Sequence, residues 1–216
     1  LTGDLIFSRA SLLVSDLGTR PMKIQAQTFE RLVLGQLYET TGVRENQDIL
    51  DHYIAVIEGK TGSLIAAAGE YGSLLAGASE EVIQMLATYG ELVGVAFQLA
   101  DDVIDIVSDG ASSGKTQGTD LREGVPTLPT ILLDRAVAAG DESAIKVRAL
   151  LDADLSSDEA LETAVEALAA HPVTQEAWQI AYDWADRAIA AIAPLPESTA
   201  KAALESFAHA VVHREG

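Results

Sequence analysis

The sequence predicts an all-α protein, and three observations carry that prediction. Apolar residues recur at helical spacing along nearly the whole 216-residue chain. No segment alternates apolar and polar residues in the way that a half-buried strand does. Hydrophobic residues make up 48% of the chain but aromatic residues only 5%. Small and aliphatic side chains therefore dominate the expected core, which favours closely packed helices.

The first helices are delimited by glycines, a proline and one capping residue. An initial amphipathic helix is expected to end near Gly18, and Pro21 is placed to open a second helix that runs to about Gly42. Asp48 is the predicted N-cap of a third helix. The Gly-Lys-Thr-Gly sequence at residues 59–62 is expected to interrupt this helix before it resumes through the alanines that follow.

The longest predicted helix begins after Ser79 and reaches about Ser108, a length of roughly 40 Å at 1.5 Å per residue. The glycine-rich residues 108–126 break the pattern and are expected to form a loop, after which Pro126 opens another helix. The acidic, alanine-rich remainder predicts further amphipathic helices near residues 141–152, 156–170, 172–193 and 197–213.

Neither an internal repeat nor a low-complexity linker divides the chain, so residues 1–216 are expected to form a single helical domain. The sequence opens at Leu1 in what reads as the middle of a helix, and we expect that something precedes it in the gene product. No stretch approaches 18 uncharged apolar residues, so no transmembrane segment is predicted. Asp4 and Arg9 interrupt the first apolar run, which argues against a signal peptide.

Composition also limits the classes of partner. The formal net charge of −19 would repel nucleic acid and anionic membranes, so neither is an expected partner. Anionic substrates would need metal ions or a local basic cluster to reverse the sign of the field. The chain has no cysteine, which excludes disulfides, thiolate metal sites and a cysteine nucleophile, and agrees with a cytoplasmic location.

Three aspartates close the apolar stretch of the longest helix. Asp101 and Asp105 are one turn apart and share a face, while Asp102 lies about 100° round the helix. Carboxylates that project from a rigid helix are suitable ligands for Mg²⁺, which binds few protein oxygens and retains waters or substrate phosphates. A solvated acidic face is the alternative in so acidic a chain. The glycine-flanked Lys115 that follows is placed to swing back toward a phosphate at this helix end, although a loop lysine is more often simply solvated.

This ordered set resembles the second aspartate-rich region of the trans-polyprenyl diphosphate synthases. The matching residues are Phe97-Gln98-Leu99-Ala100-Asp101-Asp102-Val103-Ile104-Asp105, Gly114-Lys115, Gly118-Thr119-Asp120-Leu121 and Glu123-Gly124. Upstream, Gly59-Lys60-Thr61-Gly62-Ser63-Leu64 resembles the Lys-Thr segment of the family, Gly3-Asp4-Leu5 its Gly-Asp helix start, and Gly35-Gln36 and Thr127-Leu128-Pro129 also fit. Order and spacing agree from residue 1 to about residue 135.

The resemblance implies an isoprenoid-synthase-type bundle of long helices around an apolar cavity, incomplete at its N-terminus. It implies a Mg²⁺-dependent prenyltransferase that condenses isopentenyl diphosphate with an allylic diphosphate, and a homodimer. By this resemblance Asp101, Asp102 and Asp105 would hold Mg²⁺ bridging to the allylic diphosphate. Lys60 and Lys115 would contact that diphosphate, and Thr61 and Gln98 would lie beside the ionising carbon. Small residues at 66–69 and 72 would line part of the cavity or, as small residues more often do, pack helices closely.

Two features depart from the pattern of the family. The first aspartate-rich motif of the family is not found, because Asp48 and Asp51 have neither its spacing nor its place. The chain by itself is therefore expected to lack most metal ligands and not to turn over. Val125 stands where many relatives have a lysine, and Arg122 is a candidate to compensate.

Three other readings of the sequence remain open. A non-catalytic helical subunit of a heteromeric prenyl diphosphate synthase would explain the absent first motif, although it would have little reason to keep the three aspartates and both lysines. A class I terpene cyclase shares the fold but commonly has an Asn/Ser/Glu metal motif where this chain has Asp-Asp-x-x-Asp. A plain helical scaffold is the remaining alternative.

Overall fold

The computed structural model describes residues 1–108 and 117–214, and every described element is a helix. The elements are α1 (Thr2–Ser15), α2 (Thr19–Thr41), α3 (Ile49–Ile57), a π-helical turn η1 (Glu58–Gly62), α4 (Ser63–Leu75), α5 (Glu80–Val107), α7 (Thr119–Glu123), α8 (Leu128–Ala138), α9 (Glu142–Leu151), α10 (Asp158–Ala169), α11 (Pro172–Ala191) and α12 (Thr199–Val212). The all-α prediction is confirmed.

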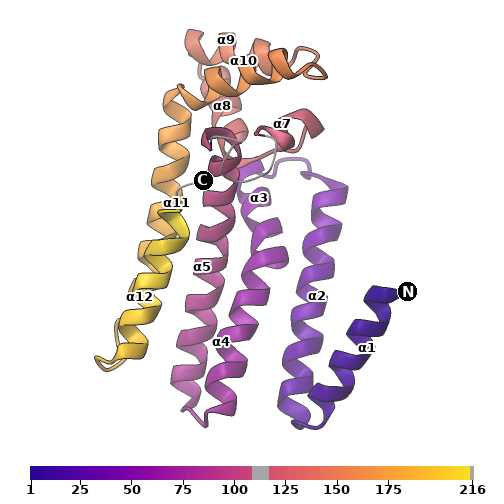
Figure 1. Ribbon diagram of the computed structural model, residues 1–216, viewed down its shortest axis with the longest axis vertical. Coiled ribbons are helices and arrows are strands. Elements are labelled where there is room, and N and C mark those ends of the chain that lie inside the picture. Colours follow the sequence, from indigo (N-terminus) through magenta and orange to yellow (C-terminus); the bar gives the residue numbers. More distant parts are fainter. Residues whose placement is uncertain (109–116, 215–216) are drawn as a thin grey trace.

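Helix α5 is the axis of the bundle (Figure 1). It packs along α4 on one side and along α11 on the other; α12 contacts both α11 and α5, and α2 lies beyond α4. Helices α9 and α10 cross the end at which α5 finishes. Twelve of the 28 residues of α5 are buried, including Val93, Ala96 and Leu99. The aspartates at the end of α5 are thus carried by the central helix of the bundle.

Helix boundaries that depend on local capping agree with the sequence. The side chain of Asp48 accepts hydrogen bonds from the backbone N–H groups of Leu50 and Asp51, and Ser79 accepts one from Val82. Because a cap pairs with a backbone N–H two or three residues away, it can be predicted without knowledge of the tertiary structure.

Three boundaries differ from the prediction. Residues 59–62 do not interrupt the helix, because the chain passes from α3 to α4 through the π-helical turn η1. Helix α8 begins at Leu128, not at Pro126, because the side chain of Thr130 accepts a hydrogen bond from the backbone N–H of Thr127 and caps the helix there. Within the predicted loop, residues 119–123 form the short helix α7.

Close backbone contacts explain the glycines around η1. A Cβ added to Gly94 on α5 would lie 2.7 Å from the Cα of Gly62, and one added to Gly59 would lie 3.0 Å from the Cα of Gly35 on α2. The backbone of α5 therefore approaches η1 so closely that a Cβ on Gly94 would force the two apart, and the backbone of α2 approaches η1 almost as closely. The small Gly69 likewise packs α4 onto the backbone of α5, so close packing is the correct interpretation for that residue.

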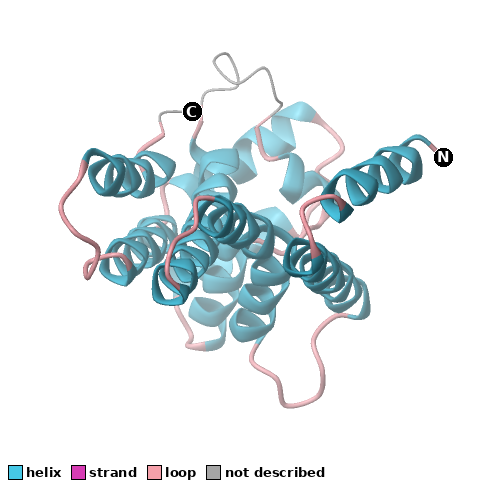
Figure 2. Cartoon of the chain, turned by 90° about the horizontal axis from the view of Figure 1, so that it is seen from below, coloured by secondary structure: helices cyan, strands magenta, loops and turns pink. Residues whose placement is uncertain are grey.

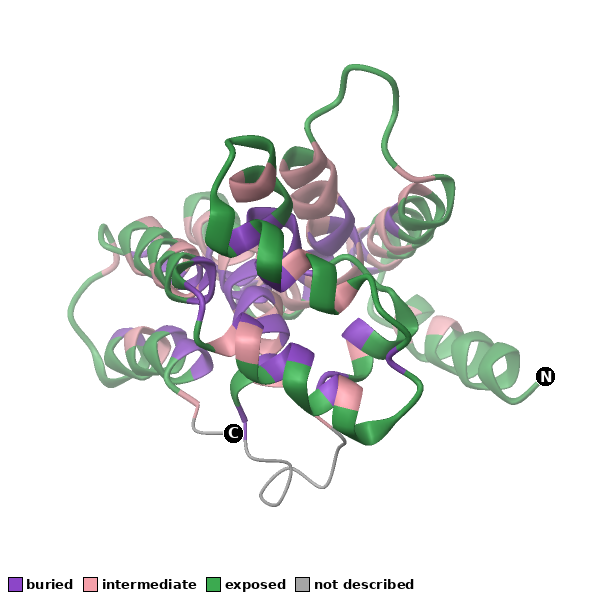
Figure 3. Ribbon diagram, turned by 90° about the horizontal axis from the view of Figure 1, so that it is seen from above, coloured by how far each residue is buried: buried purple, intermediate pink, exposed green. Residues whose placement is uncertain are grey.

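Burial is uneven across the bundle (Figure 3). Helix α1 stands at the edge of the bundle (Figure 2) and has no buried residue. Its contact with α2 includes the Phe7 and Phe29 rings, whose centroids are 4.6 Å apart. The two helices carry many exposed apolar side chains, including Leu5, Ile6, Leu12, Leu13, Val33 and Leu37.

By length and apolar composition alone, α5 could cross a membrane, a test that the core helix of a soluble protein also passes. Here it lies between α4 and α11. The absence of a membrane-spanning segment stays a prediction.

Candidate functional site

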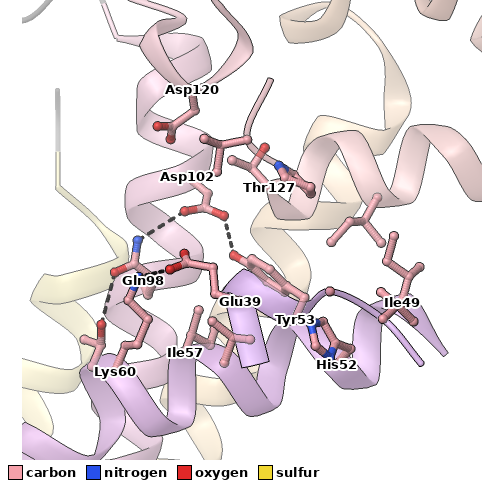
Figure 4. A pocket seen from close by; sticks show the side chains of 17 residues that line it. Glu39, Ile49, His52, Tyr53, Ile57, Lys60, Gln98, Asp102, Asp120 and Thr127 are labelled. Atoms are coloured by element: carbon pink, nitrogen blue, oxygen red, sulfur yellow. Dashed lines mark hydrogen bonds and ion pairs between the residues drawn. The ribbon is translucent and has the colours of Figure 1, made fainter. Parts of the chain in front are cut away.

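A cavity of about 290 Å³ opens where the end of α2, helix α3, η1 and the last turns of α5 meet (Figure 4). One part of its wall is apolar and is formed by Val43, Ile49, Val56, Ile57, Pro126 and Ile131. The other part is polar and is formed by Glu39, His52, Tyr53, Lys60, Thr61, Gln98, Asp102, Asp120 and Thr127. A cavity with an apolar wall and a few convergent polar groups suits a small amphiphilic ligand.

The structure brings the three predicted catalytic residues together in this cavity. Lys60 and Thr61 project from η1, and Gln98 projects from the facing turn of α5. The Thr61 hydroxyl donates a hydrogen bond to Gln98 Oε1 at 3.2 Å. Because the glycine contacts described above fix η1 against α5, these side chains are held by backbone packing and not by a mobile loop.

Lys60 is already paired in this structure. Its Nζ lies 2.6 Å from Glu39 Oε2, and Glu39 comes from the last turn of α2 (Figure 4). Gln36 Nε2 donates to the same carboxylate oxygen at 2.7 Å. The predicted diphosphate-binding ammonium group is therefore held at the rim of the cavity by a carboxylate that motif comparison did not single out.

Asp102 points into the cavity wall and is buried. Its Oδ2 accepts hydrogen bonds from the Tyr53 hydroxyl and from the backbone N–H of Leu128, and its Oδ1 accepts one from Gln98 Nε2 at 3.2 Å. Burial raises the pKa of this carboxyl group to about 6, although the three donors oppose the shift. Burial also raises the pKa of Tyr53 well above its usual range, so the phenol remains a donor.

Asp101 and Asp105 lie on the neighbouring face of α5. Arg214, which follows α12, places its Nη2 at 3.4 Å from Asp101 Oδ1 and stacks its guanidinium 4.2 Å above the Phe97 ring. Asp105 receives a hydrogen bond from the backbone N–H of Asp120 at 3.4 Å. Burial, and secondly the Asp120 carboxylate, raise the pKa of Asp105.

The donor set of this face fits a divalent cation. Asp101 already attracts a guanidinium, and the charges of Asp105 and Asp120 repel one another, so a cation there would lower the electrostatic free energy. Carboxylate oxygens are the ligands that Mg²⁺ prefers. Within the described part of the chain, however, no three acidic or histidine side chains converge into a complete metal site. The oxygens of Asp102 are directed toward Tyr53, Leu128 and Gln98.

Other residues that the sequence analysis raised lie elsewhere. Lys115 lies outside the described residues. Arg122 pairs with Asp158 of α10 at 2.7 Å, whereas Val125 lines the cavity. Asp48 caps α3 and pairs with Arg135 at 2.7 Å, which agrees with its exclusion as a metal motif.

Sequence reasoning missed three residues of the site. Glu39 follows Gln36 by three residues, so helical spacing alone could have placed both on one face. Nothing local in the sequence identifies Tyr53 as a residue of the site or Asp102 as the acceptor of its hydroxyl. Arg214 lies 113 residues from Asp101, and no pattern in the sequence joins them.

Comparison with known proteins identifies the family of the chain. The family model for polyprenyl synthetase matches residues 1–168. The chain is 40% identical to the nonaprenyl diphosphate synthase of Mycobacterium tuberculosis, with 100% of this chain and 64% of the relative covered. It is 33% identical to the octaprenyl diphosphate synthase of Escherichia coli, with 100% and 66% covered. The chain thus spans slightly less than two-thirds of the length of these curated relatives.

Solved structures give the same result. A geranylgeranyl pyrophosphate synthase from Corynebacterium glutamicum, complexed with calcium and isoprenyl diphosphate, superposes with a TM-score of 0.86 at 41% identity, covering 99% of this chain and 66% of that one. A decaprenyl diphosphate synthase from Rhodobacter capsulatus superposes with a TM-score of 0.81 at 33% identity, covering 99% and 66%. The predicted isoprenoid-synthase-type fold is confirmed, and the chain belongs to the polyprenyl synthetase family.

Proposed function

We propose that the protein containing this chain is a prenyltransferase that extends an allylic diphosphate with isopentenyl diphosphate to give a longer trans-polyprenyl diphosphate. One observation carries the proposal. Lys60, Thr61 and Gln98 meet in a single cavity that is also lined by apolar side chains such as Val56, Ile57 and Ile131. An allylic diphosphate has the same two-part character, with a charged head and a hydrocarbon tail.

The side chains of the cavity have distinct tasks in this reaction. The Lys60 ammonium group binds the diphosphate and stabilises the charge that develops on it as the allylic C–O bond breaks. The Thr61 and Gln98 oxygens lie beside the carbon that becomes electron-deficient. The apolar wall, including Val56 and Ile57, keeps water from that carbon until the double bond of isopentenyl diphosphate attacks it and a proton is lost.

We assign a divalent cation, Mg²⁺, to the carboxylates of Asp101 and Asp105, with Lys115 as a second cationic group for the diphosphate. Bound there, Mg²⁺ would neutralise charge on the leaving diphosphate. We give Asp102 a positioning role in place of direct coordination, because its two oxygens accept three hydrogen bonds within the protein. It orients Gln98 and connects α5 to α3 and to the start of α8.

We further propose that the protein is a cytoplasmic homodimer. The dimer is supported by the exposed apolar side chains of α1 and α2, several of which are at least half exposed, such as Leu5 at 71% and Leu13 at 59%. Contiguous exposed apolar side chains are typical of protein interfaces. Light scattering of the purified whole protein would give twice the mass of one chain if this proposal is correct, and the mass of one chain if it is wrong.

The reaction is tested with the whole protein, labelled isopentenyl diphosphate and an allylic diphosphate, and extraction of the elongated product. Product is expected with Mg²⁺ and not after chelation. Asp101→Asn should lower kcat by at least about 100-fold, because it weakens the carboxylate site that would hold the Mg²⁺. The exposed Asp186 of α11 provides a matched control, and Asp186→Asn should leave turnover unchanged. Turnover without a divalent cation, or undiminished turnover of Asp101→Asn, would refute the assignment.

A further inference from the structure

The ammonium group of Lys60, which is the proposed ligand of the substrate diphosphate, forms an ion pair with Glu39. The Lys60 side chain is 31% exposed and that of Glu39 is 41% exposed, and their charged atoms are 2.6 Å apart. Both residues line the cavity, so neither has to enter it from elsewhere when a ligand arrives. Gln36 donates a second hydrogen bond to the same oxygen of Glu39, which holds the carboxylate in the position that meets Lys60.

The ion pair matters because acidic side chains outnumber basic ones in the lining of the cavity. Among the described residues that line it, Lys60 is the one lysine and there is no arginine, whereas Glu39, Asp102 and Asp120 are acidic. A diphosphate that entered this part of the cavity would meet one cation already neutralised by a neighbour. To bind Lys60, the diphosphate must displace the carboxylate of Glu39.

We propose that Glu39 is a positioning residue that competes with the diphosphate for Lys60 and so sets the affinity of the site for the allylic substrate and for the released diphosphate. The inference rests on the proposed function, because it takes Lys60 as a diphosphate ligand. In the empty site Glu39 holds the ammonium group at the rim. During turnover Lys60 transfers to the diphosphate, and after the reaction Glu39 recaptures it.

The mechanical arrangement permits this exchange. Lys60 is anchored on η1 by the contact of Gly59 with Gly35, while Glu39 is anchored in the last turn of α2. Both backbones are fixed, and both side chains are long, flexible and partly exposed, so only the ends of the side chains have to move. Because partly exposed ion pairs are weak, the competition is mild, which allows both substrate capture and product release.

The test uses the isosteric substitution Glu39→Gln, which removes the charge and keeps the shape. Binding of inorganic diphosphate to the whole protein is measured by calorimetry in saturating Mg²⁺. Loss of a partly exposed ion pair predicts a dissociation constant about two- to fivefold lower than that of the wild type. Steady-state kinetics should show the KM for the allylic substrate and the inhibition constant of diphosphate falling together, with the KM for isopentenyl diphosphate unchanged.

Two controls separate the competition from a general change of charge. Glu30→Gln makes the same change at an exposed position on the same helix, about 13 Å along it, and should leave the dissociation constant unchanged. In a Lys60→Met background, Glu39→Gln should no longer tighten binding, because the group for which Glu39 competes is gone. Circular dichroism of each variant checks that the helices remain folded.

The outcomes distinguish this inference from the proposed function. If the wild type binds diphosphate and Glu39→Gln binds it no more tightly, the competition is refuted while the proposed function stands. If Glu39→Gln tightens binding equally in the Lys60→Met background, Glu39 acts through the general field, and the inference is wrong. If the wild type does not bind diphosphate in Mg²⁺, both the proposed function and the inference fail.

Discussion

Replacement of Tyr53 by phenylalanine removes one hydroxyl group from a buried polar cluster and leaves the ring in place. That hydroxyl donates to Asp102, which is only 5% exposed. The backbone N–H of Leu128 and the side chain of Gln98 remain as donors to the same carboxylate. The variant therefore tests whether Tyr53 stabilises the ionised form of Asp102 inside the protein.

The loss of unfolding free energy expected for Tyr53→Phe depends on whether Asp102 is protonated. Its pKa is raised from 3.8 to about 6 in the folded protein. The folded chain therefore binds the proton of Asp102 more tightly than the unfolded chain does. Below pH 3.8 this difference adds fully to the free energy of unfolding, and the contribution is lost as the pH rises through 6. The difference corresponds to about 3 kcal/mol at neutral pH.

Loss of the Tyr53 donor raises this folded-state pKa further, because a hydrogen bond to the charged form is lost. At pH 8, where Asp102 is ionised, Tyr53→Phe should lower the free energy of unfolding by about 2 kcal/mol, as expected for a hydrogen bond to a charged group. At pH 5 most Asp102 is protonated, and the cost should fall to about 1 kcal/mol or less, as for a neutral hydrogen bond.

Urea denaturation at pH 5 and pH 8 measures both values. Tyr89→Phe is the matched control, because the Tyr89 hydroxyl donates to the neutral backbone carbonyl of Leu204 at 2.6 Å. Its cost should be about 1 kcal/mol at both pH values. If the cost of Tyr53→Phe is the same at pH 5 and pH 8, or equals that of Tyr89→Phe at both, the reasoning about a buried ionised Asp102 is wrong.

Two further substitutions test the packing around the site. Gly94→Ala would place a Cβ 2.7 Å from the Cα of Gly62 and so push η1 away from α5. The substitution should lower the free energy of unfolding by about 1–3 kcal/mol and reduce turnover, whereas unchanged stability would contradict the close contact. Lys201→Met removes a buried ammonium group that donates to the carbonyls of Ala193 and Leu195. Thermal unfolding should show that the free energy of unfolding falls by about 1–3 kcal/mol, while no decrease would show that these carbonyls find other donors.

Local signals predicted most of the fold. The caps at Asp48 and Ser79 were correct because each pairs with backbone groups within three residues. The amphipathic segments after residue 140 were placed to within two residues by their helical periodicity. The error at residues 59–62 arose because glycine usually weakens a helix, whereas here Gly59 and Gly62 permit contact with α2 and α5. Sequence spacing does not contain that information.

The sequence predicted which residues form part of the candidate site, but not which side chains they contact. Lys60, Thr61 and Gln98 were expected at one place and share one cavity. What the sequence could not supply was the partner of each group. The contact of Glu39 with Lys60 joins residues 21 positions apart, and that of Tyr53 with Asp102 joins residues 49 positions apart. The resemblance assigned all three aspartates to the metal, whereas burial and three hydrogen bonds within the protein separate Asp102 from Asp101 and Asp105.

The most direct test of the account is a crystal structure of the whole protein with Mg²⁺ and an allylic thiolodiphosphate, an analogue that resists ionisation. The diphosphate should lie within hydrogen-bond distance of Lys60 Nζ, with Lys60 released from Glu39. The hydrocarbon tail should lie against Val56 and Ile57. A diphosphate bound away from Lys60, or a tail outside this cavity, would contradict the central claim.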